Sequence, residues 1–273
     1  MTTKQERLAS VQRERAARLR RENAPKKKLQ TGIPEVDNAR ATPLVGSDEV
    51  GFGAWAGELV TCAVASPCDW DPHDPLVRDS KTLSPAQREE VYARYFNLEA
   101  EEEHKLVISP YAIEICEINE YPIHACLKRA HRDAIAGTFW RLPCLPIVVV
   151  DGIVDPELEK GLTYAPKVFC LPKADSLVPA VALASIIAKV TRDRMMVEWD
   201  KQYPGYDFAS NKGYGTPRHQ EGLLKLGPCP IHRKTYAPIR DVLEARQRAS
   251  QAREDDLCAE PFDIMAVMEE LSK

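Results

Sequence analysis

The chain has 273 residues, of which 44% are hydrophobic, so it can bury the core of one large domain with appendages. No stretch approaches the roughly 18 to 20 apolar residues of a membrane helix, and no apolar segment follows the charged N-terminus, so we expect neither a membrane protein nor a secretory signal but a cytoplasmic protein. Eight scattered cysteines without a Cys-x-x-Cys pair argue against a zinc site of the usual spacing and fit free thiols.

The net charge of −4 is unevenly distributed along the chain. Residues 1–30 carry ten Lys/Arg and three Asp/Glu, whereas the remainder carries 27 basic and 38 acidic residues. A basic arm can bind nucleic-acid phosphates while the acidic body does something else, although a solubilising tail has the same composition. We predict a helical or disordered arm at 1–40, a catalytic domain at 41–240 and a helical C-terminal extension at 241–273.

The first half of the globular region alternates apolar runs with turn and helix-start residues. Ser84, Pro85 and Gln87 form a helix start with a capping box. Apolar, β-branched runs bounded by turn residues predict strands. In chain order we predict strands at 44–48 and 58–66, a helix at 84–96, a strand at 104–109, a helix opened by Ser109 and Pro110, and a helix at 124–139.

The second half continues the alternation of strands with helices. The run "IVVV" is too short and too β-branched for a helix, and Gly152 ends it. The predicted elements are strands at 145–152 and 164–172 and helices at 176–204, 216–227 and 239–255. Because strands first cluster and then alternate with helices, an α/β layer architecture is favoured.

Acidic side chains lie where predicted strands end. Asp48 and Glu49 close the first strand, Asp151 closes "IVVV", and Asp175 precedes the long helix. Ligands of open α/β sheets gather at strand ends, so these carboxylates could converge. Converging carboxylates repel one another unless a cation neutralises them, and hard oxygen ligands suit Mg²⁺ or Mn²⁺. Two such ions can activate a water and stabilise the leaving oxygen of a phosphodiester.

Each acid also has a simpler explanation. Asp48 and Glu49 could be a solvated pair in a turn, and Asp151 could be a turn residue before glycine. Asp175 could only cap the following helix. Spacing alone therefore does not decide whether these acids form a metal site.

Six segments, in order, decide between these explanations. They are "GSDEVGFGAWAGELVTCAV", "RDSKTLSPAQRE", "ICEINEYPIHACLKRAHRDAI", "IVVVDG", "KADSLVPAVALASIIAKVTRDRMM" and "NKGYGTPRHQEGLLKLGPCPIHRKTYAPI". Together they resemble the signature segments of the ribonuclease HII family, the prokaryotic-type type 2 ribonucleases H, over roughly residues 44–240. The sister ribonuclease HIII family shares the acidic opening but usually differs at the His-Arg segment.

The resemblance implies a ribonuclease H-like mixed β-sheet flanked by helices, with a helical C-terminal extension. It also implies that Asp48, Glu49, Asp151 and Asp175 bind Mg²⁺ or Mn²⁺, two ions when substrate is bound. The implied activity is hydrolysis of the RNA strand of RNA/DNA hybrids and cleavage 5′ of ribonucleotides embedded in duplex DNA, leaving 3′-hydroxyl and 5′-phosphate ends. A monomer is expected, with nucleic acid as its partner and without a membrane.

The resemblance implies a role for the glycines beside the acid pair. A protein that distinguishes RNA from DNA must contact the 2′-hydroxyl, and Gly51 and Gly53 let main-chain groups approach it. Phe52 stands where the family usually has arginine, so we expect hydroxyl sensing to survive with altered affinity or junction preference. Tyr214 matches the tyrosine that packs on the sugar next to the ribonucleotide; the alternative is a core tyrosine.

Four basic residues are candidates for contacts with substrate. Lys81 matches a phosphate-binding lysine, although it could be an ordinary exposed lysine. Lys189 and Arg192 share a helical face and could both touch a phosphate strand. Arg192 could instead be structural, and Arg233 in "HRKTY" could support either the site or the substrate strand.

Other functions compete with this interpretation. A metal nuclease of the resolvase or integrase type could use a similar acidic sheet, and a non-catalytic hybrid-binding protein could use the basic arm. A metabolic α/β enzyme is disfavoured because the sequence has neither a Walker loop nor Gly-x-Gly-x-x-Gly. No clear sliding-clamp-binding peptide stands at the C-terminus.

Overall fold

The computed structural model describes residues 31–38, 42–67, 70–160 and 165–259, with side chains described up to residue 252. Residues 1–30 of the predicted arm at 1–40 and residues 260–273 of the predicted C-terminal extension lie outside the described residues. Within the described ranges, no helix is long and apolar enough to cross a bilayer.

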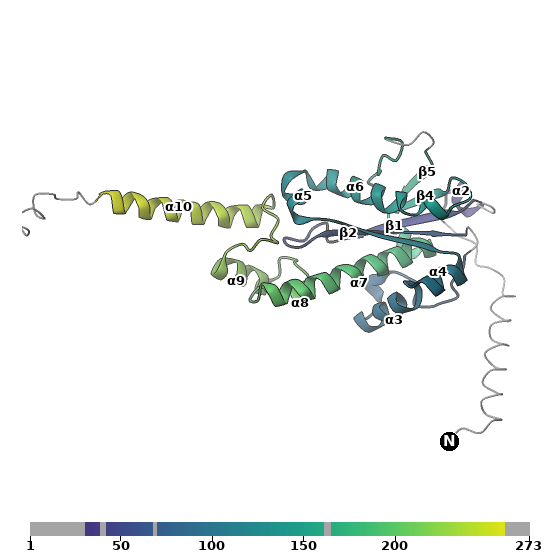
Figure 1. Cartoon of the computed structure of the whole chain (residues 1–273), viewed down its shortest axis with the longest axis horizontal. Helices are drawn as coiled ribbons and strands as arrows, with labels where there is room; N and C mark the ends of the chain where they lie inside the picture. The colour runs from purple at the N-terminus through teal and green to yellow at the C-terminus, as the bar shows by residue number, and fades with distance from the viewer. Residues whose placement is uncertain (1–30, 39–41, 68–69, 161–164, 260–273) are drawn as a thin grey trace, which may run out of the picture.

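A mixed sheet of five strands forms the centre of the molecule (Figure 1). The strand order is β3-β2-β1-β4-β5. The hairpin strands β1, β2 and β3 pair antiparallel, whereas β4 and β5 continue parallel to β1. The bounds are Leu44–Val50 for β1, Leu59–Ser66 for β2, Val107–Ile113 for β3, Ile147–Asp151 for β4 and Lys167–Leu171 for β5.

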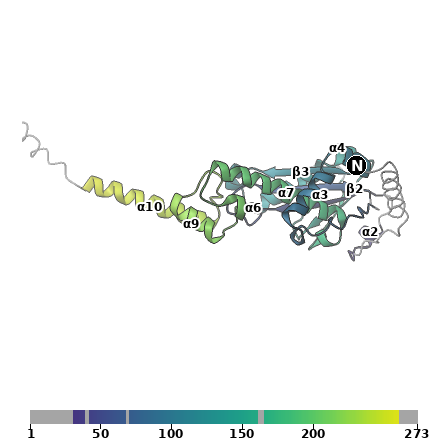
Figure 2. The ribbon, with the colours of Figure 1, turned by 90° about the horizontal axis from the view of Figure 1, so that it is seen from below.

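Helices cover both faces of this sheet (Figure 1). Helices α5 and α6 lie on one face, and α7 lies on the other together with α3 and α4; α10 projects away from the body beyond α9, as Figure 2 also shows. The bounds are α2 Pro34–Asp37, α3 Pro85–Tyr95, α4 Leu98–His104, α5 Ile115–Glu120, α6 Ile123–Ala136, α7 Pro179–Gln202, α8 Phe208–Asn211, α9 Pro217–Leu226 and α10 Ala237–Ala259. The predicted mixed sheet, flanking helices and helical C-terminal part are thus confirmed.

Small residues allow α7 to lie directly on β1. A Cβ atom added at Gly46 would stand 2.4 Å from the main-chain nitrogen of Val181. Ala180 and Ala184, on the first turns of α7, are buried in the same core. Because the backbones approach this closely, the side chains of β1 and α7 are held in fixed mutual positions where the strand ends.

The predicted helix start at Ser109 and Pro110 is wrong. Both residues belong to β3, where Pro110 pairs with Cys62. Because β3 is an edge strand, a proline without an N–H group can sit there, with the missing donor on the unpaired side. The helix begins at Ile115 instead.

Candidate active site

Asp48 and Asp151 lie side by side where the pairing of β1 with β4 ends. Strands β1 and β4 run parallel, and their last paired residues are Ser47 and Val150. Each acid is the next residue along its strand, and the charge of Asp151 adds to burial and to the charge of Glu49 in raising the pKa of Asp48. The parallel pairing of β1 with β4 thus places these two acids next to each other, as the sequence predicts.

Asp151 in turn fixes the segment that carries Asp175. The main-chain N–H of Ala174 donates to Asp151 Oδ1 at 2.6 Å, at the start of the 3₁₀ turn Ala174–Ser176. Asp175 is buried, and this burial, followed by the neighbouring charge of Asp151, raises its pKa. The residue that precedes α7 in cap position is Val178, so Asp175 does not cap that helix.

Burial and mutual repulsion make the ionised carboxylates costly. Burial, and then the charge of Glu49, raise the pKa of Asp48 to about 7. Burial is also the largest cause that raises the pKa of Asp151 and of Asp175. A cation between these groups would remove both penalties, and carboxylate oxygens are hard ligands of the kind that Mg²⁺ and Mn²⁺ take. The donor set therefore fits such an ion.

The carboxylates do not yet surround a common point. Among the described residues, no three His, Cys, Asp or Glu side chains are arranged closely enough to hold a metal ion. Metal binding would therefore require these side chains to rotate toward each other.

Two buried contacts next to the acids escape sequence reasoning. Ser185, on α7, lies close enough to Asp48 to oppose the rise of its pKa, and its Oγ lies 2.9 Å from Ser80 Oγ. On the other face of the sheet, His131 of α6 lies within 2.8 Å of Ser47 Oγ and 3.3 Å of Glu49 Oε2. A lone serine on the largely buried first half of α7 and a lone histidine on the amphipathic helix α6 carry no signal of such long-range contacts.

Lys81 belongs to the same surroundings. Burial raises the pKa of Asp151 and of Asp175, and the charge of Lys81 opposes this rise in both, whereas the charge of Asp79 adds to it in Asp175. Lys81 is exposed, in the short turn Ser80–Thr82. It therefore lies at the acidic site with its ammonium group open to a further anion, and Asp79 is a fifth acid that the sequence did not single out.

The Arg192 side chain packs against the inner side of the glycine loop Gly51–Gly53, which follows β1. Gly51 has φ +90°, and a Cβ added there would stand 2.2 Å from Arg192 Nε, whereas a Cβ at Gly53 meets nothing within 4 Å. The Arg192 guanidinium donates to the carbonyl oxygens of Glu58, Lys212 and Ala56 at 2.8 to 3.0 Å. Since its side chain is fully buried, the predicted phosphate contact of Arg192 is replaced by the structural alternative.

Arg233 holds the same loop from the other side. Its Nε donates to Gly57 O at 2.9 Å and its Nη1 to Phe52 O at 3.0 Å. Tyr236 donates its hydroxyl to the same Phe52 carbonyl. Arg233 is fully buried, so of its two predicted roles it supports the site. The Phe52 ring packs against His124, with ring centroids 5.1 Å apart.

Tyr214 stands beside this loop. The main-chain N–H of Trp55 donates to Gly213 O at 2.8 Å, which joins the segment before Tyr214 to the loop. Tyr214 is 38% exposed, so it is not a core tyrosine. The buried Arg192 guanidinium lies 5.7 Å from its ring centroid. The loop and the tyrosine thus form one surface.

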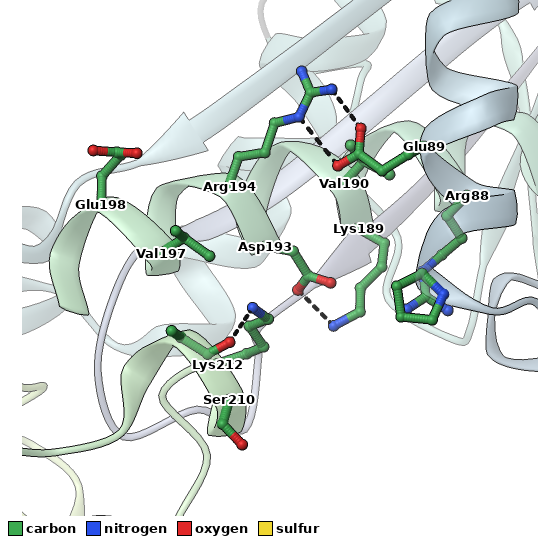
Figure 3. Close-up of a pocket in the computed structure, with 12 residues that line it drawn as sticks. Arg88, Glu89, Lys189, Val190, Asp193, Arg194, Val197, Glu198, Ser210 and Lys212 are labelled. Atoms are coloured by element: carbon green, nitrogen blue, oxygen red, sulfur yellow. Dashed lines mark hydrogen bonds and ion pairs between the residues drawn. The ribbon is translucent and has the colours of Figure 1, made fainter. Parts of the chain in front are cut away.

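A groove with a volume of about 510 Å³ lies between α3, α7 and α8 (Figure 3). Lys189 lines it and is paired with Asp193, with 2.7 Å between Nζ and Oδ1. Lys189 lies on α7 one turn beyond Ser185, the residue that contacts Asp48. Arg192 is buried, whereas Lys189 lines this surface groove one helical turn from Ser185 and thus near the acids.

Comparison with known proteins agrees with the sequence segments. The family model described as Ribonuclease HII matches residues 45–239. The chain belongs to the ribonuclease HII family. A ribonuclease HII of Thermus thermophilus is 42% identical over 196 residues, which cover 72% of this chain and 87% of the relative.

Solved structures support the ribonuclease HII fold. The ribonuclease H2 of Pyrococcus horikoshii OT3 is similar, with a TM-score of 0.58 and 28% identity over 74% of this chain and 98% of that one. The manganese complex of Bst-RNase HIII has a TM-score of 0.60 at 19% identity, covering 78% of this chain and 73% of that one, and shows likeness of fold. The predicted family and its ribonuclease H-like architecture are confirmed.

Proposed function

We propose that this ribonuclease HII-family chain is a metal-dependent endoribonuclease. It hydrolyses the RNA strand of RNA/DNA hybrids and cuts duplex DNA on the 5′ side of an embedded ribonucleotide, leaving 3′-hydroxyl and 5′-phosphate ends. Asp48, Glu49, Asp151 and Asp175 are the proposed ligands of two Mg²⁺ or Mn²⁺ ions in the substrate complex. Membership of the family supports the reaction class.

The observation that carries this proposal is the placement of Asp48 and Asp151 next to each other on the paired parallel strands β1 and β4, where burial raises the pKa of both carboxyls, that of Asp48 to about 7. A fold that only needed a buried polar residue at the end of β1 could use asparagine without this electrostatic penalty. Retaining like charges at Asp48, Glu49 and Asp151 costs stability and is useful when a cation is to be bound there. Such ions would activate water and neutralise the charge that develops on a phosphodiester.

The chain's own groups orient the substrate around that centre. The Gly51–Gly53 main chain is open on the side of Gly53 and is proposed to contact the 2′-hydroxyl. The exposed Tyr214 ring would stack on the neighbouring sugar, and Lys81 and Lys189 would bind backbone phosphates. Arg192 and Arg233 act indirectly, because both hold the loop from inside.

The test is to map the cut in duplex DNA that bears one ribonucleotide, with each end labelled in turn. We expect a metal-dependent cut 5′ of the ribonucleotide and none in the all-DNA duplex. Asp48→Asn should nearly abolish cleavage while hybrid binding stays largely intact.

Asp133→Asn serves as the matched control, since Asp133 pairs with Arg129 on α6, on the other face of the sheet from α7. Hybrid binding without metal-dependent cleavage, or a preference for four-way junctions, would contradict the proposal.

A further inference from the structure

Two histidines contact each other in a closed part of the core next to Tyr214. His219 lies on α9 and His232 in the segment before α10, and both are fully buried. Their Nε2 atoms are 3.0 Å apart. The rings of Tyr206 and Phe208 pack around the pair, with centroids 5.0 to 6.3 Å from the imidazoles. The metal site does not account for this pair.

The hydrogen bonds determine which nitrogen of each ring carries a proton. His232 Nδ1 faces three groups of Cys229: the main-chain N–H at 2.9 Å, the thiol at 3.1 Å and the carbonyl oxygen at 3.2 Å. The N–H is the shortest of these contacts and can only donate, so Nδ1 accepts. Neutral His232 then carries its proton on Nε2 and donates to His219 Nε2. His219 in turn carries its proton on Nδ1 and donates to the carbonyl oxygen of Tyr214 at 3.0 Å. Every ring nitrogen has a partner in this arrangement.

Burial disfavours a positive charge on the pair. Burial, and then the charge of His219, lower the pKa of His232 to about 4, and burial lowers the pKa of His219. Cys229 and Tyr206 are titratable groups that contact the pair, and burial raises the pKa of both, Cys229 to about 11. Adding a proton to the pair would set two N–H donors against each other, either between the two Nε2 atoms at 3.0 Å or between His232 Nδ1 and the Cys229 N–H at 2.9 Å.

The relay ends on the residue that is proposed to contact the sugar. The Tyr214 carbonyl also accepts the Thr216 main-chain N–H at 2.8 Å, so two donors fix this peptide group. The Trp55 ring lies 5.6 Å from the His219 ring and comes from the glycine loop segment. The relay therefore fixes Tyr214 relative to the loop that is proposed to contact the 2′-hydroxyl.

We propose that His219 and His232 are positioning residues for substrate selection: their hydrogen-bonded relay sets the Tyr214 backbone so that its ring meets the sugar beside the ribonucleotide. This inference rests on the proposed function of Tyr214. It assigns neither histidine to the metal site or to proton transfer in the reaction. Its consequence is that selection of the ribonucleotide junction can be lost while metal binding remains.

The first test is the protonation pattern of the wild-type protein, measured from ¹⁵N histidine resonances at pH 7. We expect two neutral imidazoles, with the proton on Nε2 of His232 and on Nδ1 of His219. A charged ring in the pair, or a proton on His232 Nδ1, would overturn the relay whatever the protein cleaves.

The second test compares kcat/KM on a single embedded ribonucleotide with kcat/KM on an all-RNA strand in a hybrid. His219→Leu, which removes both hydrogen bonds, should lower this ratio about tenfold, roughly the loss of one buried hydrogen bond. His219→Gln, which can still donate and accept, should recover part of it. The Mn²⁺ affinity measured by calorimetry should stay unchanged in both variants.

Two further variants separate this role from general stiffening of the fold. Gln220→Ala removes a side-chain hydrogen bond to Gly215 O at 3.1 Å, on the same helix and the same segment, without touching the pair. It should keep the ratio. Tyr214→Ala should lower the ratio, and adding His219→Leu should lower it no further, because both changes act through one residue.

The outcomes distinguish the inference from the proposed function. If wild type cleaves embedded ribonucleotides but His219→Leu keeps the ratio, or Gln220→Ala loses it equally, the positioning role is wrong and the proposed function stands. If wild type cleaves neither substrate, the proposed function fails and the selection role fails with it.

Discussion

The main-chain N–H of Trp55 donates to the carbonyl oxygen of Gly213 at 2.8 Å. This bond joins the loop after the first acidic strand to the segment that carries Tyr214, far along the chain. A Cβ atom at Gly213 would stand 2.3 Å from Ala56 O, so the two backbones meet directly. This main-chain contact therefore fixes the loop that is proposed to contact the 2′-hydroxyl relative to Tyr214, which is proposed to contact the sugar. Both lie next to the carboxylates.

Alanine should lower the stability of the protein at Gly51 but not at Gly53. In Gly51→Ala the new methyl group would meet Arg192 at a φ of +90°, so we expect a loss of several kcal/mol in the free energy of unfolding, of the order seen for overpacked or strained sites. Gly53→Ala meets open space and should leave stability within about 0.5 kcal/mol. Urea unfolding measures both.

Gly53→Ala should nevertheless impair cleavage of embedded ribonucleotides, because its methyl group would stand between the loop and the sugar. If Gly53→Ala keeps full activity, substrate does not approach this part of the main chain.

Asp48→Asn should stabilise the metal-free protein at alkaline pH. The folded pKa of about 7 lies above the ordinary value of 3.8, so the ionised form destabilises the fold above pH 7 and this penalty disappears as pH falls toward 4. The expected gain at pH 8 is at most about 4 kcal/mol, with no gain at pH 4. Urea unfolding in a chelating buffer at the two pH values measures it.

Mn²⁺ should stabilise wild type at pH 8 far more than it stabilises Asp48→Asn. A variant that is less stable than wild type at pH 8, or that gains equally at pH 4, would show that Asp48 is not held under electrostatic penalty.

His131 should affect metal binding through Glu49. His131→Leu removes the side chain that lies 3.3 Å from Glu49 Oε2 and 2.8 Å from Ser47 Oγ. Within the described part of the chain, His131 Nε2 makes no hydrogen bond, so its effect on Glu49, a proposed metal ligand, comes from proximity and packing. Losing a group that positions a metal ligand typically weakens binding 10- to 100-fold, so we expect about a tenfold rise in the Mn²⁺ dissociation constant, measured by calorimetry. His131→Gln, which keeps a polar side chain, should lose less. Equal affinities in all three proteins would leave His131 as a packing residue only.

Lys189 and Asp193 should change binding of hybrid duplexes in opposite directions. Lys189→Gln removes a cation from the groove of Figure 3 and should reduce the slope of log K against log salt by about one. Asp193→Asn frees Lys189 from its 2.7 Å ion pair and should tighten binding at low salt. Fluorescence anisotropy across a salt series gives both slopes. If neither variant changes the slope, nucleic acid does not pass through this groove.

Patterns along the chain predicted the parts of the site that depend on strand ends. Asp48 and Asp151 could be paired from sequence because each closes an apolar run, and parallel strands end at the same edge. Asp175 lies after a further strand, and its segment is held by the Asp151 carboxylate; the convergence of all four acids on a metal stays a prediction. Burial decided one question that the sequence left open: Tyr214 is exposed, so it is not a core tyrosine.

Contacts between distant segments explain what the sequence could not show. The helical face that Arg192 shares with Lys189 left two roles open, a phosphate contact and a structural one; its guanidinium turns inward to three carbonyl oxygens. Ser109 and Pro110 predict a helix start because an edge strand cannot be recognised without its neighbours. Tertiary packing also brought His131 to Glu49, and no local pattern marks a side chain that crosses the core.

The most direct test of the acidic metal site is Mn²⁺ titration by calorimetry at pH 7 in buffers of different ionisation enthalpy. Because burial and then the charge of Glu49 raise the pKa of Asp48 to about 7, part of its carboxyl population is protonated at that pH. We predict that Mn²⁺ binding releases protons at pH 7, that the release vanishes at pH 9, and that Asp48→Asn abolishes tight binding and lowers the release. Mn²⁺ binding of equal strength in Asp48→Asn, without proton release in wild type, would contradict the account.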